Sequence, residues 1–139
     1  MEQIKRVWFS DNRIYILTAD GTEKSRPLEA FPRLKDASDE QRNSYEVWDD
    51  GQSIRWEEID EDVHVSSFSE STEPNYDNEV AKMIDSVGVL DVSAFAEMIG
   101  MSKSKLDLFR YGIWKPSDDS LQKIKDGLRQ IECRIAAVL

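Results

Sequence analysis

The chain has little cysteine and histidine and no long apolar run. Its one cysteine, Cys133, cannot form an internal disulfide, and its one histidine, His64, has no cysteine or second histidine nearby to complete a metal site. No apolar segment approaches the roughly 20 residues that a membrane helix needs. The charged start, Met1 to Arg6, is not followed by an apolar signal segment. We therefore expect a cytoplasmic protein without disulfides and without a membrane partner.

The sequence also lacks the motifs by which enzymes are usually identified. No paired acid and base, nucleophile triad, phosphate-binding loop or metal-ligand set appears in the sequence. The acidic run Glu57 to Asp62 could bind a divalent cation, but it lacks the loop-forming glycine and the regular spacing of a calcium site, so a solvated acidic edge is the expected interpretation. The sequence predicts no enzyme, no catalytic residue, no cofactor and no bound metal.

The negative charge is unevenly distributed along the chain. The formal charge is -10, and residues 1–78 account for all of it, with 9 basic against 19 acidic side chains, whereas residues 79–139 hold 9 of each. Residues 102–117 contain four basic side chains and one acidic side chain, Asp107, so the local charge is +3. Because phosphate contacts need lysine and arginine, this window is the candidate nucleic-acid interface.

The N-terminal half shows the alternation of short half-buried strands. Ile4–Phe9 and Arg13–Thr18 are predicted to form a hairpin, followed by a weaker strand at 23–28. Ser38 precedes acidic residues and is expected to cap a helix of about two turns. A second hairpin joins Tyr45–Trp48 to Ser53–Trp56, and Val63 and Val65 extend a last edge. Residues 1–70 are therefore predicted to form an acidic α+β domain with a small antiparallel sheet.

A change of composition marks the boundary. Residues 71–78 are polar and poor in large apolar side chains, which is typical of a linker. From Glu79 onward the apolar residues follow a helical period, and residues 79–139 are predicted to form an all-α domain of four helices. Asp91 and Ser102 are the expected N-caps of its second and third helices, and Gly100 supplies the turn between these two.

Two helices at this spacing allow the first to brace the second in a DNA major groove. The residues from Phe95 to Ser102, together with Leu106, Gly112, the run 115–117 and the run 120–124, resemble the lambda-repressor and Cro family. The resemblance covers roughly residues 79–130. It implies a helix-turn-helix fold and binding to double-stranded DNA.

By position, the resemblance places several polar side chains at the DNA. The predicted DNA-binding residues are Ser93, Ser102, Lys103, Ser104, Lys105, Arg110 and Lys115. Lysine can reach phosphates or guanine acceptors, and serine can hydrogen-bond either. Val92 departs from the polar residue that many relatives carry there, and Asp107 is expected to add repulsion on the recognition helix.

The N-terminal half has its own resemblance. The run 11–16, the run Phe31 to Leu34 and the run Arg55 to Asp62 resemble a small bacterial α+β family of unknown function. In some members this domain precedes a repressor-like domain, and others are described as antitoxins encoded beside a small partner protein. The resemblance thus implies a protein partner, toxin-like or other, for the acidic domain.

These observations lead to one expectation and one alternative. We expect a DNA-binding transcriptional regulator. If the protein is antitoxin-like, we expect it to repress its own gene and to bind a protein partner through its N-terminal domain. The alternative is a protein-interaction module whose helix-turn-helix no longer binds DNA, which Val92, Asp107 and the overall acidity would permit. At the C-terminus, Ile131, Ile135 and the run 138–139 either complete the core or build a homodimer interface.

Overall fold

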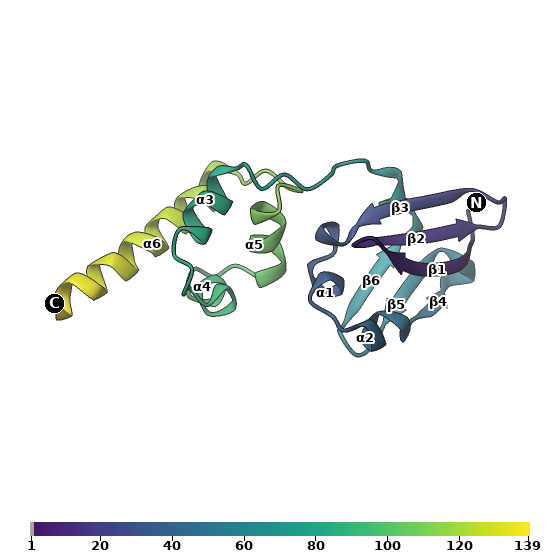
Figure 1. Cartoon of the computed structure of the whole chain (residues 1–139), viewed down its shortest axis with the longest axis horizontal. Coiled ribbons are helices and arrows are strands. Elements are labelled where there is room, and N and C mark those ends of the chain that lie inside the picture. Colours follow the sequence, from purple (N-terminus) through teal and green to yellow (C-terminus); the bar gives the residue numbers. More distant parts are fainter. Residues whose placement is uncertain (1) are drawn as a thin grey trace. The chain divides into compact units, whose positions relative to one another are not determined.

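The computed structural model describes residues 2–139 and divides the chain into two compact units, Met1–Pro74 and Asn75–Leu139 (Figure 1). All strands lie in the first unit, and the second unit is helical. The expected α+β class, with antiparallel sheet before a helical region, is therefore confirmed. Each unit has its own cluster of buried apolar side chains.

The first unit contains two three-stranded antiparallel sheets rather than one, with strand orders β1-β2-β3 and β4-β5-β6. Short helical segments connect the strands. The strands are β1 (Ile4–Ser10), β2 (Arg13–Thr18), β3 (Glu23–Pro27), β4 (Glu46–Trp48), β5 (Ser53–Trp56) and β6 (Glu61–His64). The helical segments are η1 (Leu28–Ala30), α1 (Pro32–Lys35), α2 (Asp39–Asn43), η2 (Asp49–Gly51) and η3 (Val65–Ser69).

Local sequence signals explain the first sheet. Asp11 and Asn12 take positive φ angles of 51° and 61°, the conformation of a two-residue hairpin turn that matches the twist of the strands. The Asn12 side chain donates to both carboxylate oxygens of buried Glu29, at 3.1 and 3.2 Å. Along β2 every second side chain is buried, with Ile14 and Ile16 fully inside. The predicted first hairpin is confirmed.

The short helices of this unit also follow their local signals. Ser38 caps α2 by accepting a hydrogen bond from the Gln41 amide, while the Gln41 side chain accepts one from the Ser38 amide, so the two form a capping box. Trp56 on β5 is fully buried and donates its indole N–H to the Arg42 carbonyl at 2.9 Å. This bond joins the end of α2 to the second sheet.

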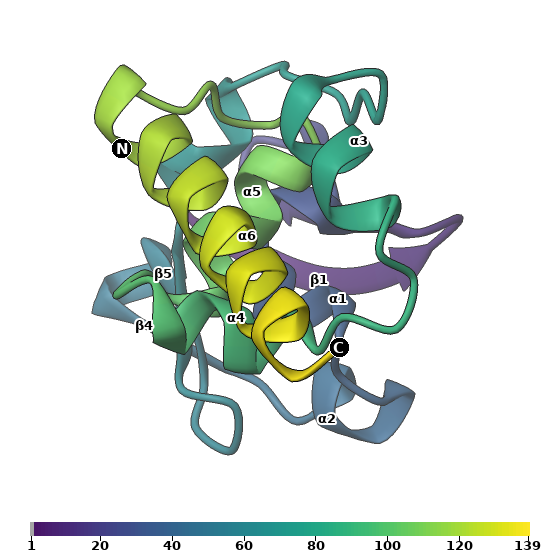
Figure 2. The same cartoon turned by 90° about the vertical axis from the view of Figure 1, so that its left-hand side faces the viewer.

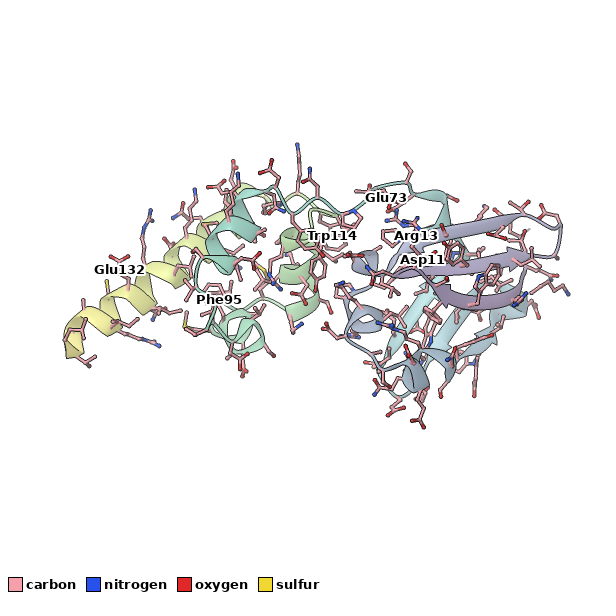
Figure 3. The ribbon with its side chains drawn as sticks, viewed as in Figure 1. Asp11, Arg13, Glu73, Phe95, Trp114 and Glu132 are labelled. Atoms are coloured by element: carbon pink, nitrogen blue, oxygen red, sulfur yellow. The ribbon has the colours of Figure 1, made fainter. Side chains whose placement is uncertain are left out.

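Two arginines hold the segment after η3 against the first sheet. Buried Arg26 on β3 donates to the Thr72 carbonyl at 2.8 Å. Arg13 on β2 pairs with both carboxylate oxygens of Glu73, at 2.6 and 3.2 Å, and Figure 3 shows these two side chains meeting. The chain is therefore bonded to the first sheet as far as Glu73, almost at the end of the first unit.

The Arg13–Glu73 pair predicts a pH effect. The hydrogen bond from Arg13 lowers the pKa of Glu73, so this pair contributes stability above the ordinary glutamate pKa and loses it as pH falls through the lowered pKa. Because Glu73 is largely exposed, we expect a small effect. Urea unfolding of Glu73→Gln and the parent chain should differ at neutral pH and converge in acid. A difference that is constant across pH would contradict this assignment.

The second unit consists of α3 (Glu79–Asp85), α4 (Val92–Met98), α5 (Lys103–Arg110) and α6 (Asp118–Val138). Each helix begins at a residue whose side chain accepts a backbone N–H of the first turn; these residues are Asn78, Asp91, Ser102 and Ser117. The predicted caps at Asp91 and Ser102 are confirmed. None of the helices in residues 2–139 is both long and apolar enough to cross a lipid bilayer.

Candidate nucleic-acid interface

Helices α4 and α5 are joined by a short turn that holds them in contact. Gly100 takes a φ of +73°, which favours glycine, and the amide of Met101 bonds the Ala96 carbonyl at 2.9 Å. Ala96 is buried, so its small side chain allows the close approach of the helices. Leu106 of α5 is completely buried beneath them. The turn and the buried residues therefore hold α5 against α4 by the buried face of α5.

The N-terminal end of α5 collects four of the predicted site residues. Ser102 caps the helix by accepting from the Lys105 amide at 3.1 Å, and the run 103–105 forms the first turn. No acidic residue lies in this turn, whereas α6 begins with Asp118 and Asp119. Since the start of a helix carries partial positive charge, exposed Lys105 reinforces a site suited to anions.

Asp107 differs from the expectation that it would add repulsion. Its side chain is completely buried and bonds Lys103 Nζ at 2.7 Å and an Arg110 guanidinium nitrogen at 2.8 Å. The negative charge of Asp107 is therefore neutralised by two cations and is not exposed on the surface of α5. The expectation that Asp107 adds repulsion was wrong, because it did not take account of the burial of this carboxylate between two cations.

Arg110 is more enclosed than the sequence interpretation assumed. Its guanidinium also contacts Asp85 of α3 at 3.2 Å, and only a fifth of the side chain is exposed. Burial alone would lower the pKa of Arg110, but the hydrogen bonds with Asp107 and Asp85 outweigh it and raise that pKa. Arg110 thus ties α5 to α3 and has little freedom to reach a ligand.

The remaining predicted residues lie on other elements. Ser93 is exposed on α4, and Lys115 is exposed in the loop between α5 and α6. Within residues 2–139, neither Lys105 nor Lys115 forms an ion pair, in contrast to Lys103 and Arg110. Trp114 beside Lys115 is half exposed, with its ring 6.4 Å from that of Phe109 (Figure 3). The structure therefore groups 102–105 and leaves Lys115 and Ser93 as separate exposed groups.

Sequence reasoning missed two residues that support this site. The Asn78 side chain donates to the Asn75 and Arg110 carbonyls, at 2.8 and 2.9 Å, while capping α3. Its place before a helical run was a usable cap signal. Asp85 lies 25 residues before its partner Arg110, and no local pattern connects them.

The carboxylates of the first unit do not assemble a metal centre. Arg55 contacts Glu57, Asp60 and Asp62 at 3.1, 2.9 and 3.0 Å. Across the part of the chain that the structure describes, no group of carboxylates, histidines and cysteines is arranged to hold a metal ion. The acidic run therefore surrounds an arginine.

Comparison with known proteins informs only the N-terminal part. No curated protein and no solved structure matches this chain. The family match at residues 4–70 does not extend into the helical unit. Residues 4–70 match a family described as "Protein of unknown function (DUF2442)", so the first unit is similar to a domain of unknown function.

Proposed function

We propose that the helical unit binds double-stranded DNA through α5 and that the protein is a transcriptional regulator. The observation that carries the proposal is the start of α5, where Ser102, Lys103 and Lys105 surround a helix N-terminus with no acid in its first turn. Such an end attracts phosphate oxygens through its dipole and through the unpaired charge of Lys105. No chemistry on the DNA is required.

The second support is the way α4 and α5 are held together. The turn at Gly100 and the buried Ala96 pack α4 against α5 while the lysines of α5 stay accessible. A braced helix with an accessible polar end is the arrangement with which helix-turn-helix proteins enter a major groove. We therefore assign α5 as the recognition helix.

The ion pairs suggest a division of roles among the predicted residues. Unpaired Lys105 and Lys115 are proposed to contact phosphates, because their full charge is available. Lys103 and Ser104 are proposed to face base edges, with Lys103 held in position by Asp107. Ser93 and Ser102 are proposed to donate to the backbone of the DNA, whereas Arg110 is reassigned to positioning α5.

This division predicts a specific salt effect. Replacing both Lys105 and Lys115 by alanine should reduce the slope of log affinity against log salt by about 2, since each phosphate contact contributes about one unit. Fluorescence anisotropy with a labelled duplex measures this slope. The matched control, Lys5→Ala/Lys24→Ala, removes the same charge from the first unit and should leave the slope unchanged. Equal slopes for both double variants would contradict the proposed contacts.

The ion pairs also favour one alternative. Of the four basic side chains in 102–117, Lys103 and Arg110 are paired with Asp107, and Arg110 also with Asp85, so the free positive charge is smaller than the sequence count of +3 suggests. The second candidate is therefore an interaction module in which these helices bind protein. A well-folded chain that shows no salt-sensitive DNA binding would contradict the first proposal and leave this alternative standing.

For the first unit we propose a protein partner, as in an antitoxin-like autoregulator. Edge strand β4 is exposed along its length, with Val47 and Trp48 standing among Glu46, Asp49 and Asp50. An exposed tryptophan within an acidic surround suits a basic partner that offers an apolar pocket. Trp48→Ala should therefore abolish co-purification with the basic product of a neighbouring gene, and retention of the complex would contradict this surface.

A further inference from the structure

A pocket lies in the second unit where the start of α3, the end of α5 and the start of α6 come together. Its volume is about 370 Å³, near the lower end of the range for small-molecule sites. Val80 and Phe109 in its lining are almost fully buried. Figure 2, in which α6 faces the viewer, shows α3 beside α6 and α5 behind it. The lining residues all belong to the second unit, so the pocket is formed by that unit alone.

Hydrogen bonds hold the walls of this pocket in place. The Asn75 amide donates to the Tyr111 carbonyl at 2.8 Å. The Asn78 side chain donates to the Asn75 and Arg110 carbonyls, at 2.8 and 2.9 Å. These bonds join the residues before α3 to the end of α5. A ligand therefore meets walls that are already formed, which lowers the entropy cost of binding.

Part of the lining is apolar and includes an exposed aromatic ring. Its members are Val80, Phe109, Trp114, Pro116 and Leu121. Trp114 is 51% exposed, and its ring lies 6.4 Å from that of Phe109 at an angle of 55°. A large planar surface is therefore open to a second ring, and aromatic rings attract each other when they stack or meet edge to face. This part of the lining favours a ligand with a planar aromatic ring.

The charged side chains of the lining favour a ligand with one negative charge. Asp77 pairs with Lys82 at 2.9 Å, and Glu79 pairs with Lys125 at 3.0 Å. Lys115 forms no ion pair within residues 2–139, so its ammonium group is free to bind an anion. A carboxylate supplies the matching charge. A doubly charged phosphate is disfavoured, because both acidic side chains are exposed near the same pocket and repel it.

We propose that this pocket binds a small aromatic carboxylate. The ring of the ligand lies against Trp114, and its carboxylate accepts a hydrogen bond from Lys115. Asn75 supplies a second donor, because its side-chain oxygen accepts from the Asp77 amide at 2.9 Å and its NH2 group remains for the ligand. An aliphatic acid would leave Trp114 uncovered, and an uncharged aromatic molecule would leave Lys115 without a partner. The proposal does not depend on DNA binding.

Titration of the whole chain with cinnamate, followed by NMR of the tryptophan indole N–H groups, tests the proposal. Trp114 is the one tryptophan of the second unit, and its signal is assigned as the one missing from Trp114→Phe. Cinnamate should shift this signal with a Kd of about 1 mM or below, as expected for so small a ligand. If the Trp114 signal does not move at about ten times that concentration, or if only another tryptophan responds, the proposal is overturned.

The chemistry of recognition is tested with two analogues and two variants. Cinnamamide lacks the charge and cyclohexanecarboxylate lacks the aromatic ring, and each should bind at least about 5-fold more weakly than cinnamate. Lys115→Ala should weaken cinnamate binding about 10-fold. The control Lys123→Ala removes the same charge from an exposed position of α6 outside the pocket and should bind like the parent. Equal far-UV circular dichroism would show that all chains are folded. Equal affinity of Lys115→Ala and the parent, or of cinnamamide and cinnamate, would overturn the proposal.

Discussion

Replacing Asp107 by alanine is expected to lower the free energy of unfolding of the helical unit by about 3 kcal/mol. The completely buried carboxylate accepts hydrogen bonds from both Lys103 and Arg110, so its loss removes one ion-pair partner from each of these two cations. The expected loss is at the low end for a broken buried pair, because both cations are partly exposed and can regain water. Urea unfolding followed by far-UV circular dichroism measures the change.

Two variants separate the ion pair from a general effect of removing an acid. Asp107→Asn keeps the shape but not the charge and should give an intermediate loss. Asp126→Ala removes a carboxylate on α6 whose pair with Arg129 is exposed, and it should cost about 0.5 kcal/mol or less. Equal losses for Asp107→Ala and Asp126→Ala would show that the buried network does not stabilise this unit.

The second large effect is expected at Gly112, after α5. Its φ is +72°, and a Cβ atom added there would lie 2.2 Å from the backbone oxygen of Asn75. Asn75 cannot easily move away, because its amide bonds the Tyr111 carbonyl at 2.8 Å. Gly112→Ala should therefore destabilise the helical unit by about 3 kcal/mol or more, through strain and overlap together. Urea unfolding checks this value.

Gly100 provides the matched control in the same unit. Its φ of +73° is nearly identical, but no atom lies within 4 Å of an added Cβ. Gly100→Ala should therefore show the backbone cost alone, about 1 kcal/mol. The difference between the two variants measures the contact with Asn75. If both alanines cost the same, the close approach at Gly112 has no energetic consequence.

The features that could be predicted from the sequence are those decided by neighbouring residues. The hairpin turn at Asp11 and Asn12 and the caps at Ser38, Asp91 and Ser102 depend on side chains that bond the backbone within a few positions. After Glu79 the apolar residues recur at helical spacing because one face of each helix is buried. For such features the sequence pattern and the physical cause are the same.

The features that could not be predicted depend on distant partners. The division of the strands into two sheets follows from packing between segments, and the alternation within each strand does not reveal it. The state of Asp107 and Arg110 depends on Asp85, which α3 brings into contact across the unit. The sequence therefore predicted the helix at Lys103–Arg110, but not which of its charged side chains are held in ion pairs.

The measurement that tests the central proposal most directly is binding of the purified full chain to DNA from upstream of its own gene, across a salt series. The proposal predicts binding that is tighter than to unrelated duplex and that weakens linearly in log affinity against log salt, with the slope reduced in Lys105→Ala/Lys115→Ala. Absence of salt-sensitive binding by the folded chain, alone and with its neighbouring gene product, would contradict the assignment of α5 as a DNA-recognition helix.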